Sequence, residues 1–178
     1  MPNLNLGCGA KKLANYINVD AQAAANPDVV LDIGRERFPW DDSSIDGVTA
    51  MHIFEHLVPD AFFHCLKEIY RVCKPGALLG VIVPHPRHDV FLNDPTHVHA
   101  ITPDGMLLFS KKHRERLIAE GIKGVTSYAD YLGVDFDLRE PVNKVLDPRI
   151  DPESDWPARE RAENNVIVEY RFTMRVVK

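Results

Sequence analysis

The sequence contains little cysteine and no long hydrophobic run. Its 178 residues include three cysteines, Cys8, Cys65 and Cys73, which are too few for a disulfide framework and lack the mutual spacing of zinc ligands. No apolar run approaches the roughly 18 residues that span a membrane, and the N-terminus has no charged-then-apolar signal region. We therefore expect reduced thiols, a cytoplasmic location and no membrane partner.

Positive charge is also in short supply. The chain carries 21 Lys and Arg against 26 Asp and Glu, which gives a net charge of −5. This balance offers no electrostatic support for a nucleic-acid partner, and we interpret the basic run at 111–117 as a solvated helix face. The length suits one domain with a sizeable core rather than two, so we predict a single domain over residues 1–178.

Short apolar runs separated by polar joints occupy the first half of the chain and predict the buried strands of a parallel sheet. These runs lie at residues 4–6, 16–20, 28–33, 45–51 and 77–84. The last run, ALLGVIVP, has the composition of a strand buried on both faces. Near the C-terminus, apolar and polar residues alternate over 166–177, which predicts a long strand, and 131–140 is its expected partner.

Two helices are expected. An apolar stripe at helical period predicts a helix over 60–73, and the Lys-Pro-Gly sequence at 74–76 is a stop signal. A second helix is predicted over 103–120, with Thr102 as its N-cap. The proline-rich and charged segment at 141–165 is expected to be an irregular excursion.

The ends of the first three predicted strands carry residues that suit an adenosine-bearing ligand. In an open parallel sheet, ligands bind at the carboxyl ends of the strands. A glycine loop at 7–9 follows the first strand, and glycines let a backbone approach a ligand closely. Asp20 ends the second strand, where it can accept hydrogen bonds from ribose hydroxyls. Asp32 and Ile33 end the third, where an acid and an apolar side chain can hold an adenine.

Four segments of the sequence resemble successive motifs of class I S-adenosylmethionine-dependent methyltransferases: LNLGCG, YINVD, FPWDDSSIDGVTAMHIFEHL and LKEIYRVCKPGALLGVIVP. The resemblance is continuous over residues 3–84. It implies an α/β fold, a Rossmann-like three-layer sandwich whose mostly parallel seven-stranded sheet has a C-terminal antiparallel strand. It also implies S-adenosyl-L-methionine as the cofactor.

The resemblance further implies where the cofactor lies. Glycines of the first loop line its methionine part, an acid after the second strand binds the ribose hydroxyls, and an acid after the third lies beside the adenine amine. The end of the fourth strand lies under the sulfonium. In this sequence the implied cofactor-binding residues are Asn5, Gly7, Cys8, Gly9, Asp20, Asp32, Ile33, Met51 and His52.

Two features depart from the family pattern. The acid that usually stands two residues before the first glycine is Asn5 here, which can orient the loop but brings no charge. Only ten residues separate Gly9 from Asp20, so residues 10–16 cannot hold a three-turn helix. We expect its absence to leave one sheet face bare for a second copy of the chain or the 141–165 excursion to cover, which favours a homodimer.

The loop expected at 85–101 is the predicted substrate side, because it holds four of the eight histidines and histidine titrates near neutral pH. We predict that His97 acts as the base with Asp94 orienting it, and that His52 is the second candidate. Glutamate and histidine are common catalytic residues, but we assign the Glu-His pair at 55–56, within FEHL, a structural role where the fourth strand connects to the following helix.

The histidine loop leaves alternatives open. The spacings His85-x-x-His88-Asp89 and His97-x-His99 could ligate a divalent metal. Loop histidines are more often exposed to solvent or hydrogen-bonded to the backbone, however, and we predict no metal site. At the level of function, the first hypothesis is methyl transfer to a small-molecule or glycan-like acceptor.

Three other functions compete with methyl transfer. Asn5 and the short first loop motivate a non-catalytic protein that binds S-adenosylmethionine or S-adenosylhomocysteine. A nicotinamide-dependent oxidoreductase is disfavoured, because the glycine loop lacks the third glycine and the following helix of the dinucleotide fingerprint. A metal-binding protein that uses the histidine loop is the last alternative.

Overall fold

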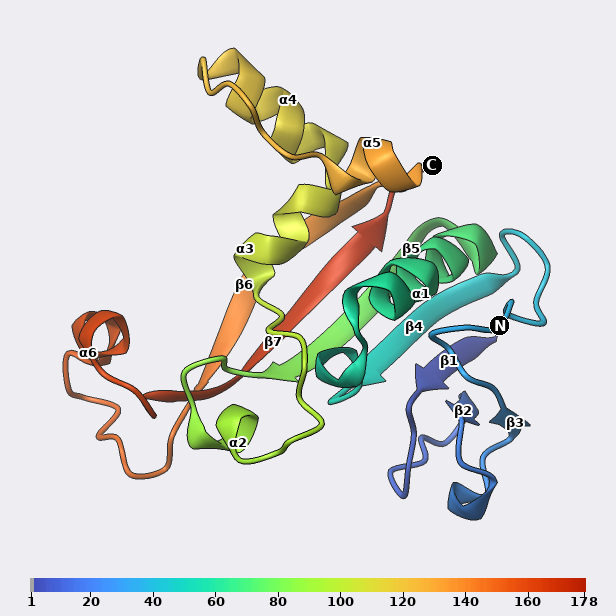
Figure 1. Cartoon of the computed structure of the whole chain (residues 1–178), viewed down its shortest axis with the longest axis horizontal. Coiled ribbons are helices and arrows are strands. Elements are labelled where there is room, and N and C mark those ends of the chain that lie inside the picture. The colour runs from blue at the N-terminus through green and yellow to red at the C-terminus, as the bar shows by residue number, and fades with distance from the viewer. Residues whose placement is uncertain (1) are drawn as a thin grey trace.

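The computed structural model describes residues 2–178, which form one seven-stranded mixed sheet in the order β3-β2-β1-β4-β5-β7-β6 (Figure 1). The strands are β1 (Asn3–Leu6), β2 (Ile17–Asp20), β3 (Val29–Val30), β4 (Ile45–Met51), β5 (Cys73–Pro84), β6 (Phe136–Leu146) and β7 (Ile167–Val176). The first five pair in parallel, and β7 runs antiparallel to both β5 and β6. The predicted fold class is confirmed.

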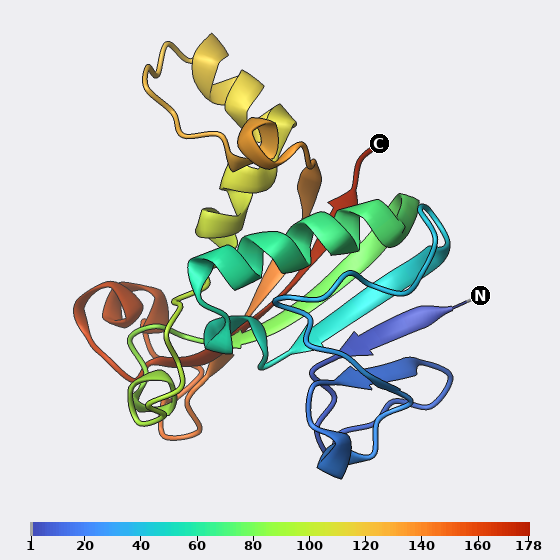
Figure 2. The ribbon, with the colours of Figure 1, turned by 45° about the vertical axis from the view of Figure 1, so that its right-hand side comes forward.

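Helices connect and cover these strands. They are α1 (Pro59–Val72), α2 (Asp89–Leu92), α3 (Pro103–Met106), α4 (Lys111–Ala119), α5 (Tyr128–Leu132) and α6 (Trp156–Ala162), with 3-10 turns η1 (Ala23–Ala25), η2 (Phe54–His56) and η3 (Leu107–Phe109). The long helix α1, expected at 60–73, crosses the front of β4 and β5 (Figure 2). No helix in the described part of the chain is both long and apolar enough to cross a membrane.

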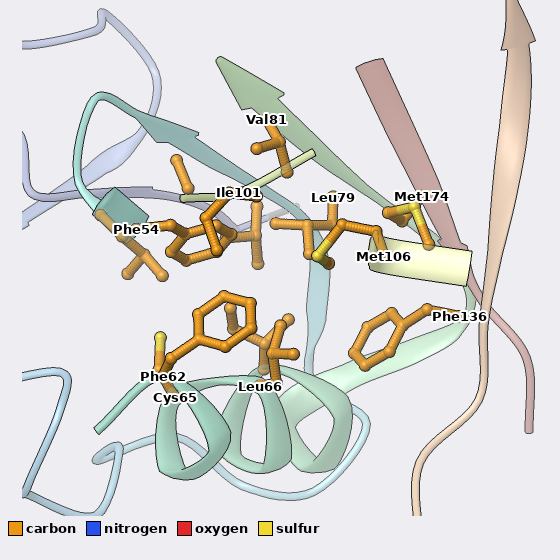
Figure 3. Close-up of a cluster of buried hydrophobic side chains, with 14 of the residues drawn as sticks. Phe54, Phe62, Cys65, Leu66, Leu79, Val81, Ile101, Met106, Phe136 and Met174 are labelled. Atoms are coloured by element: carbon orange, nitrogen blue, oxygen red, sulfur yellow. The ribbon is translucent and has the colours of Figure 1, made fainter. Parts of the chain in front are cut away.

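The core lies between α1 and the sheet. Figure 3 shows Phe62 and Leu66 of α1 pointing toward Phe54 and toward Leu79 of β5. All four side chains are at most 1% exposed. Phe54 and Phe62 meet edge to face, with ring centroids 5.2 Å apart. The stripe that predicted the helix is therefore the surface that it buries.

The central strands are apolar on one face of the sheet and polar on the other. Cross-strand partners form alternating rows. An apolar row contains Leu4, Val48, Leu79, Met174 and Leu138, and the next row contains Asn5, Thr49, Gly80, Thr173 and Arg139. Thr49, Gly80 and Thr173 are half-buried, whereas Leu79 and Met174 are fully buried. Polar residues on one face let a sheet meet solvent there.

The predicted absence of the first helix is confirmed, since residues 10–16, all described, contain none. Their loop covers Asn5 on the polar face by accepting its side-chain hydrogen bond at Lys11 O, 3.0 Å away. Over β4, β5 and β7 the same face is not covered by any helix that the structure describes, as expected from the absence of the first helix. What covers it, including a second copy of the chain, stays a prediction.

The continuous helix predicted over 103–120 is wrong. The chain instead forms α3, η3 and α4, with an extended residue, Ser110, before α4 (φ −109°, ψ 120°). The Ser110 hydroxyl accepts a hydrogen bond from His113 N, and a residue that caps a new helix cannot continue the previous one. Thr102 caps α3 as predicted, because its hydroxyl accepts from Gly105 N.

The irregular excursion predicted over 141–165 is also partly wrong. Its first six residues complete β6, and residues 156–162 form α6. The β6–β7 register shifts between Arg139 and Asn143, which accommodates Pro141 because proline has no N–H for the ladder.

The predicted strand at 77–84 differs in length and burial. Strand β5 already begins at Cys73, so the Lys-Pro-Gly sequence forms a bulge between the Ile45–Cys73 and Gly47–Leu78 pairs. Nor is β5 buried on both faces: Leu78 is 49% exposed and its neighbour Leu79 is fully buried. Exposed and buried residues alternate along β5 because only one face of the sheet is covered by α1. The uniformly aliphatic sequence did not show this alternation.

Candidate functional site

A pocket of about 440 Å³ lies at the carboxyl-terminal ends of β1, β2 and β4. Its wall contains Gly7, Asp20, Asp32, Ile33 and His52, all assigned to the cofactor from the sequence. The volume falls in the range of roughly 300–1,000 Å³ that small-molecule sites occupy. A larger hollow of about 650 Å³ against α3, α4 and β6 contains none of these residues, so the strand-end chemistry selects the smaller pocket.

Asp20 is fixed by the backbone around it. Its Oδ2 accepts from Gly9 N and its Oδ1 accepts from Gln22 N, each over 2.8 Å. A carboxylate oxygen has two acceptor positions, so each oxygen keeps one for a hydroxyl in the pocket. Asp32 is held in the same way by Gly34 N, 3.0 Å from Oδ1.

The two glycines of the first loop differ in their surroundings. Gly7 has φ +63°, and a Cβ placed there would lie 2.5 Å from the side chain of Ile53. Gly9 has φ +46°, and a Cβ there would meet nothing within 4 Å. Ile53, which lines the pocket, therefore requires glycine at position 7, whereas position 9 requires it only for the backbone conformation.

Four of the residues implied as cofactor contacts are not in this pocket wall: Asn5, Cys8, Gly9 and Met51. Asn5 is fully buried and donates from Nδ2 to Asn18 Oδ1 over 2.9 Å as well as to the glycine loop. Burial raises the pKa of the Cys8 thiol, which keeps it protonated and suits a packing role.

His52 connects the pocket to two acids. Its backbone adopts φ +52°, which is uncommon for a residue other than glycine. Its Nδ1 lies 3.4 Å from Glu55 Oε1, and its Nε2 lies 3.1 Å from Glu169 Oε2. Glu55, and then Glu169, raise the pKa of His52 against the opposing effect of burial. A raised pKa favours the charged imidazolium, which suits binding an anion better than accepting a proton.

Glu55, His56 and His97 converge beside the pocket. One ligand-type atom of each lies within 4.8 Å of the others, and the two imidazole rings meet edge to face with centroids 4.7 Å apart. Backbone hydrogen bonds hold the two segments together: Glu55 O accepts from Val98 N and His99 N, over 2.9 and 3.1 Å. Figure 1 shows the loop after α2 passing the turn that precedes α1.

The hydrogen bonds of His56 fix its tautomer. Thr96 Oγ1 donates its one hydrogen to Asp94 Oδ1, 2.6 Å away, so it accepts from His56 Nδ1 over 2.9 Å. His56 therefore carries its hydrogen on Nδ1 and keeps a free lone pair on Nε2. Both His56 and Thr96 line the pocket.

His97 has the same tautomer. Its Nδ1 lies 3.0 Å from Phe91 O, and a carbonyl only accepts, so the hydrogen is on Nδ1. Its Nε2 is 3.7 Å from Asp94 Oδ2, beyond hydrogen-bonding distance. The predicted partnership of His97 with Asp94 is thus a proximity, and the same acid binds Thr96 more closely.

The other loop histidines are engaged elsewhere. His88 Nδ1 accepts from Val90 N and its Nε2 contacts Asp147 Oδ2 at 2.9 Å, which uses both nitrogens. His85 packs its ring on Tyr170. Within residues 2–178, the cluster with metal-ligand geometry contains His97 but neither His85 nor His88.

Known proteins share this architecture. Residues 4–81 match the family model described as a methyltransferase domain. The solved structure of a SAM-dependent methyltransferase from Archaeoglobus fulgidus superposes with a TM-score of 0.59 at 20% identity, over 98% of this chain and 85% of that one. Residues 4–81 are thus similar to the methyltransferase-domain family, and the chain as a whole has the fold of S-adenosylmethionine-dependent methyltransferases.

Two further methyltransferase structures show the same fold. The enzyme from Methanosarcina mazei has a TM-score of 0.59 at 14% identity, over 99% of this chain and 92% of that one. The 1,6-didemethyltoxoflavin-N1-methyltransferase from Burkholderia thailandensis, solved with its acceptor and S-adenosylhomocysteine, has a TM-score of 0.54 at 13% identity, over 99% of this chain and 71% of that one. No curated protein sequence matches this chain.

The residues of the pocket fit S-adenosylmethionine, the cofactor of the methyltransferases that share this fold. Asp20 keeps two acceptor positions for a pair of hydroxyls, and Asp32 with Ile33 offers an acid beside an apolar surface. Their fixed hydrogen bonds mean that the site needs no rearrangement to present these groups.

Sequence reasoning missed several residues of this region. Ile53 carried no signal, because an isoleucine after a strand is ordinary. His56 was read as structural although it lines the pocket, and Glu55 was separated from His97 by 41 intervening residues. These residues could have been found by considering two sequences together. FEHL, at 54–57, follows β4, and DPTH, at 94–97, follows the neighbouring strand β5.

Proposed function

We propose that the protein transfers the methyl group of S-adenosylmethionine to a small-molecule or glycan-like acceptor. The observation that supports this most is the order of groups around one pocket: glycine loop, fixed acid, second fixed acid, and then a histidine cluster on the same wall. The first three suit the cofactor and the last suits an acceptor. The acidic net charge favours an acceptor other than nucleic acid.

Bound S-adenosylmethionine supplies a methyl group that is already activated on a sulfonium. The chain has to hold the acceptor in line with that methyl and to provide for the proton that the acceptor releases. In this proposal Gly7, Asp20, Asp32 and Ile33 bind the cofactor, and His52 lies at its sulfonium end.

The acceptor side of the proposal rests on His97, His52 and Asp94, the residues expected from the sequence, with His56 added. The neutral Nε2 atoms of His56 and His97 each keep a lone pair, whereas His52 is drawn toward its charged form by two acids. We therefore place proton acceptance at the His56–His97 pair. Asp94 acts through Thr96, as a positioning residue.

Calorimetric titration with S-adenosylmethionine and with S-adenosylhomocysteine tests the cofactor site. Wild-type protein should bind both, and Asp20→Asn should weaken binding at least tenfold, because the amide loses the charge and one acceptor oxygen. Asp41→Asn, an exposed acid outside the pocket, is the matched control and should bind normally. Absence of binding in the wild type would refute the proposal.

Turnover separates methyl transfer from the competing binding function. Release of S-adenosylhomocysteine should be measured with hydroxyl, amine and sugar acceptors. Tight cofactor binding that depends on Asp20, combined with no release on any acceptor class, would favour a protein that keeps the pocket without the chemistry.

A further inference from the structure

We propose that Glu55, His56 and His97 bind a divalent transition-metal ion, with Zn²⁺ as the best match, at the acceptor side of the pocket. The sequence predicts no metal site, and the alternative metal site that its spacings allow contains His97 together with other residues of the loop but neither Glu55 nor His56. Three observations support this site: the convergence of three ligand-type side chains, a buried carboxylate that makes no hydrogen bond to the described residues, and the tautomers of both imidazoles.

The carboxylate is the first observation. Glu55 is fully buried, and neither of its side-chain oxygens has a hydrogen-bond partner among the described residues. Its nearest cation is the His52 ring at 3.4 Å, without hydrogen-bond geometry. An ionised carboxylate that is buried without hydrogen bonds is strongly disfavoured. A bound cation would satisfy both oxygens at once.

The two histidines are independently prepared as ligands. Metal-binding histidines present one neutral ring nitrogen and donate the other N–H to a carbonyl or to a further polar group. His97 donates to Phe91 O, and His56 donates to Thr96 Oγ1, which is in turn bound to Asp94. Each ring is therefore held with its Nε2 lone pair free.

The donor set selects the class of metal. Two imidazoles and one carboxylate are the protein ligands of several catalytic zinc sites, which keep a further position open, and the same set suits other borderline divalent ions. Ca²⁺ and Mg²⁺ prefer ligands that are all oxygen. The atoms lie within 4.8 Å of one another, so ligands on a zinc ion at about 2.1 Å would have to draw closer by side-chain rotation.

The position of the cluster gives the ion a role, and this step rests on the proposed function. His56 and Thr96 belong to the wall of the cofactor pocket, so an open coordination position at this wall can take an oxygen of the acceptor. Metal coordination lowers the pKa of a bound hydroxyl. The acceptor class that follows is an oxygen nucleophile, such as an alcohol. Its proton leaves to solvent, because the Nε2 lone pairs of His56 and His97 bind the ion in this state and no longer accept the proton.

Metal binding can be measured without turnover. Chelator-treated protein should be titrated with Zn²⁺ by calorimetry and with Co²⁺ by visible absorption, which reports the coordination of the ion. We expect one equivalent of each to bind, and Glu55→Gln, His56→Ala and His97→Ala each to weaken binding at least tenfold. His113→Ala removes a half-buried histidine of α4 outside the cluster and should leave binding unchanged.

Folding is controlled within the same experiment. Without metal, the Tm of Glu55→Gln should match or exceed that of the wild type, because a buried charge that makes no hydrogen bond to the described residues is removed. Saturating Zn²⁺ should raise the Tm of the wild type, since a ligand that binds the native state stabilises it, and should not raise that of Glu55→Gln.

The outcomes separate this inference from the proposed function. Zn²⁺ and Co²⁺ binding that survives Glu55→Gln, or no binding by a folded wild type, would overturn the metal site even if S-adenosylmethionine binds through Asp20. Binding of the ion through all three residues by a protein that ignores S-adenosylmethionine would support the metal site and overturn the methyl transfer instead.

Discussion

His88 Nε2 donates a hydrogen bond to Asp147 Oδ2 over 2.9 Å, and the two side chains are only 6% and 5% exposed. This contact joins the loop after β5 to the segment after β6, which the sequence presented as two separate irregular regions. Arg149 binds the same carboxylate from the surface, 2.8 Å away. The 85–101 loop is thus anchored at its start by a buried hydrogen bond to a carboxylate.

Replacing Asp147 by Asn should destabilise the fold by roughly 2 kcal/mol at neutral pH, because the hydrogen bonds from Arg149 and His88 lose their charged acceptor. Hydrogen bonds from Arg149 and His88 hold the pKa of Asp147 well below its usual range. A lowered pKa stabilises the fold above the ordinary carboxyl pKa, near 4, and this stabilisation is lost as the pH falls below it.

Urea unfolding between pH 7 and pH 3 measures this effect. The difference in unfolding free energy between the wild type and Asp147→Asn should shrink as the pH drops below about 4. Asp151→Asn, which removes an exposed acid four residues away, is the control. A difference that stays constant down to pH 3 would contradict the account.

Gly7→Ala should destabilise the protein by roughly 3 kcal/mol, from a positive φ and a collision with Ile53. Gly9→Ala shares the positive φ but meets no atom, so about 1 kcal/mol is expected. Combining Gly7→Ala with Ile53→Ala should recover part of the loss. Denaturant unfolding of these three variants and the wild type checks this, and equal costs at the two glycines would show that Ile53 plays no part.

Asn5→Asp should lower stability by roughly 2–4 kcal/mol although the family usually carries an acid there. The amide of Asn5 donates to Lys11 O and to Asn18 Oδ1, and a carboxylate would face both acceptors without a hydrogen to give. Asn93→Asp, at an exposed position, should change little. The measurement is again unfolding free energy, and a stabilised Asn5→Asp would mean that this loop prefers a charge.

Much of the fold could be predicted because its signals are local. The stripe containing Phe62 and Leu66 marks α1, and the alternation over the last strand marks β7. The acids at the strand ends could be predicted for the same reason, since each follows its own strand in sequence. The break at Ser110 also had a local signal, a serine before a polar helical segment, which the apolar run before it obscured.

The rest depends on contacts between distant segments. The approach of His56 to His97 depends on two backbone hydrogen bonds to Glu55 O, and no periodicity encodes them. The polar face of the sheet likewise depends on the cross-strand register, which places Thr49, Gly80 and Thr173 in one row. The sequence of a single strand does not show which of its two faces lacks a covering helix.

The open sheet face predicts opposite outcomes for two adjacent leucines of β5. Leu79 is fully buried against α1, so Leu79→Ala should cost about 3 kcal/mol from lost transfer energy and the cavity left behind. Leu78 is 49% exposed on the other face, and Leu78→Ala should cost under about 1 kcal/mol. Urea unfolding of the monomeric protein at low concentration measures both. If Leu78→Ala proved as costly as Leu79→Ala, and more so at higher protein concentration, that face would be covered by a second copy of the chain.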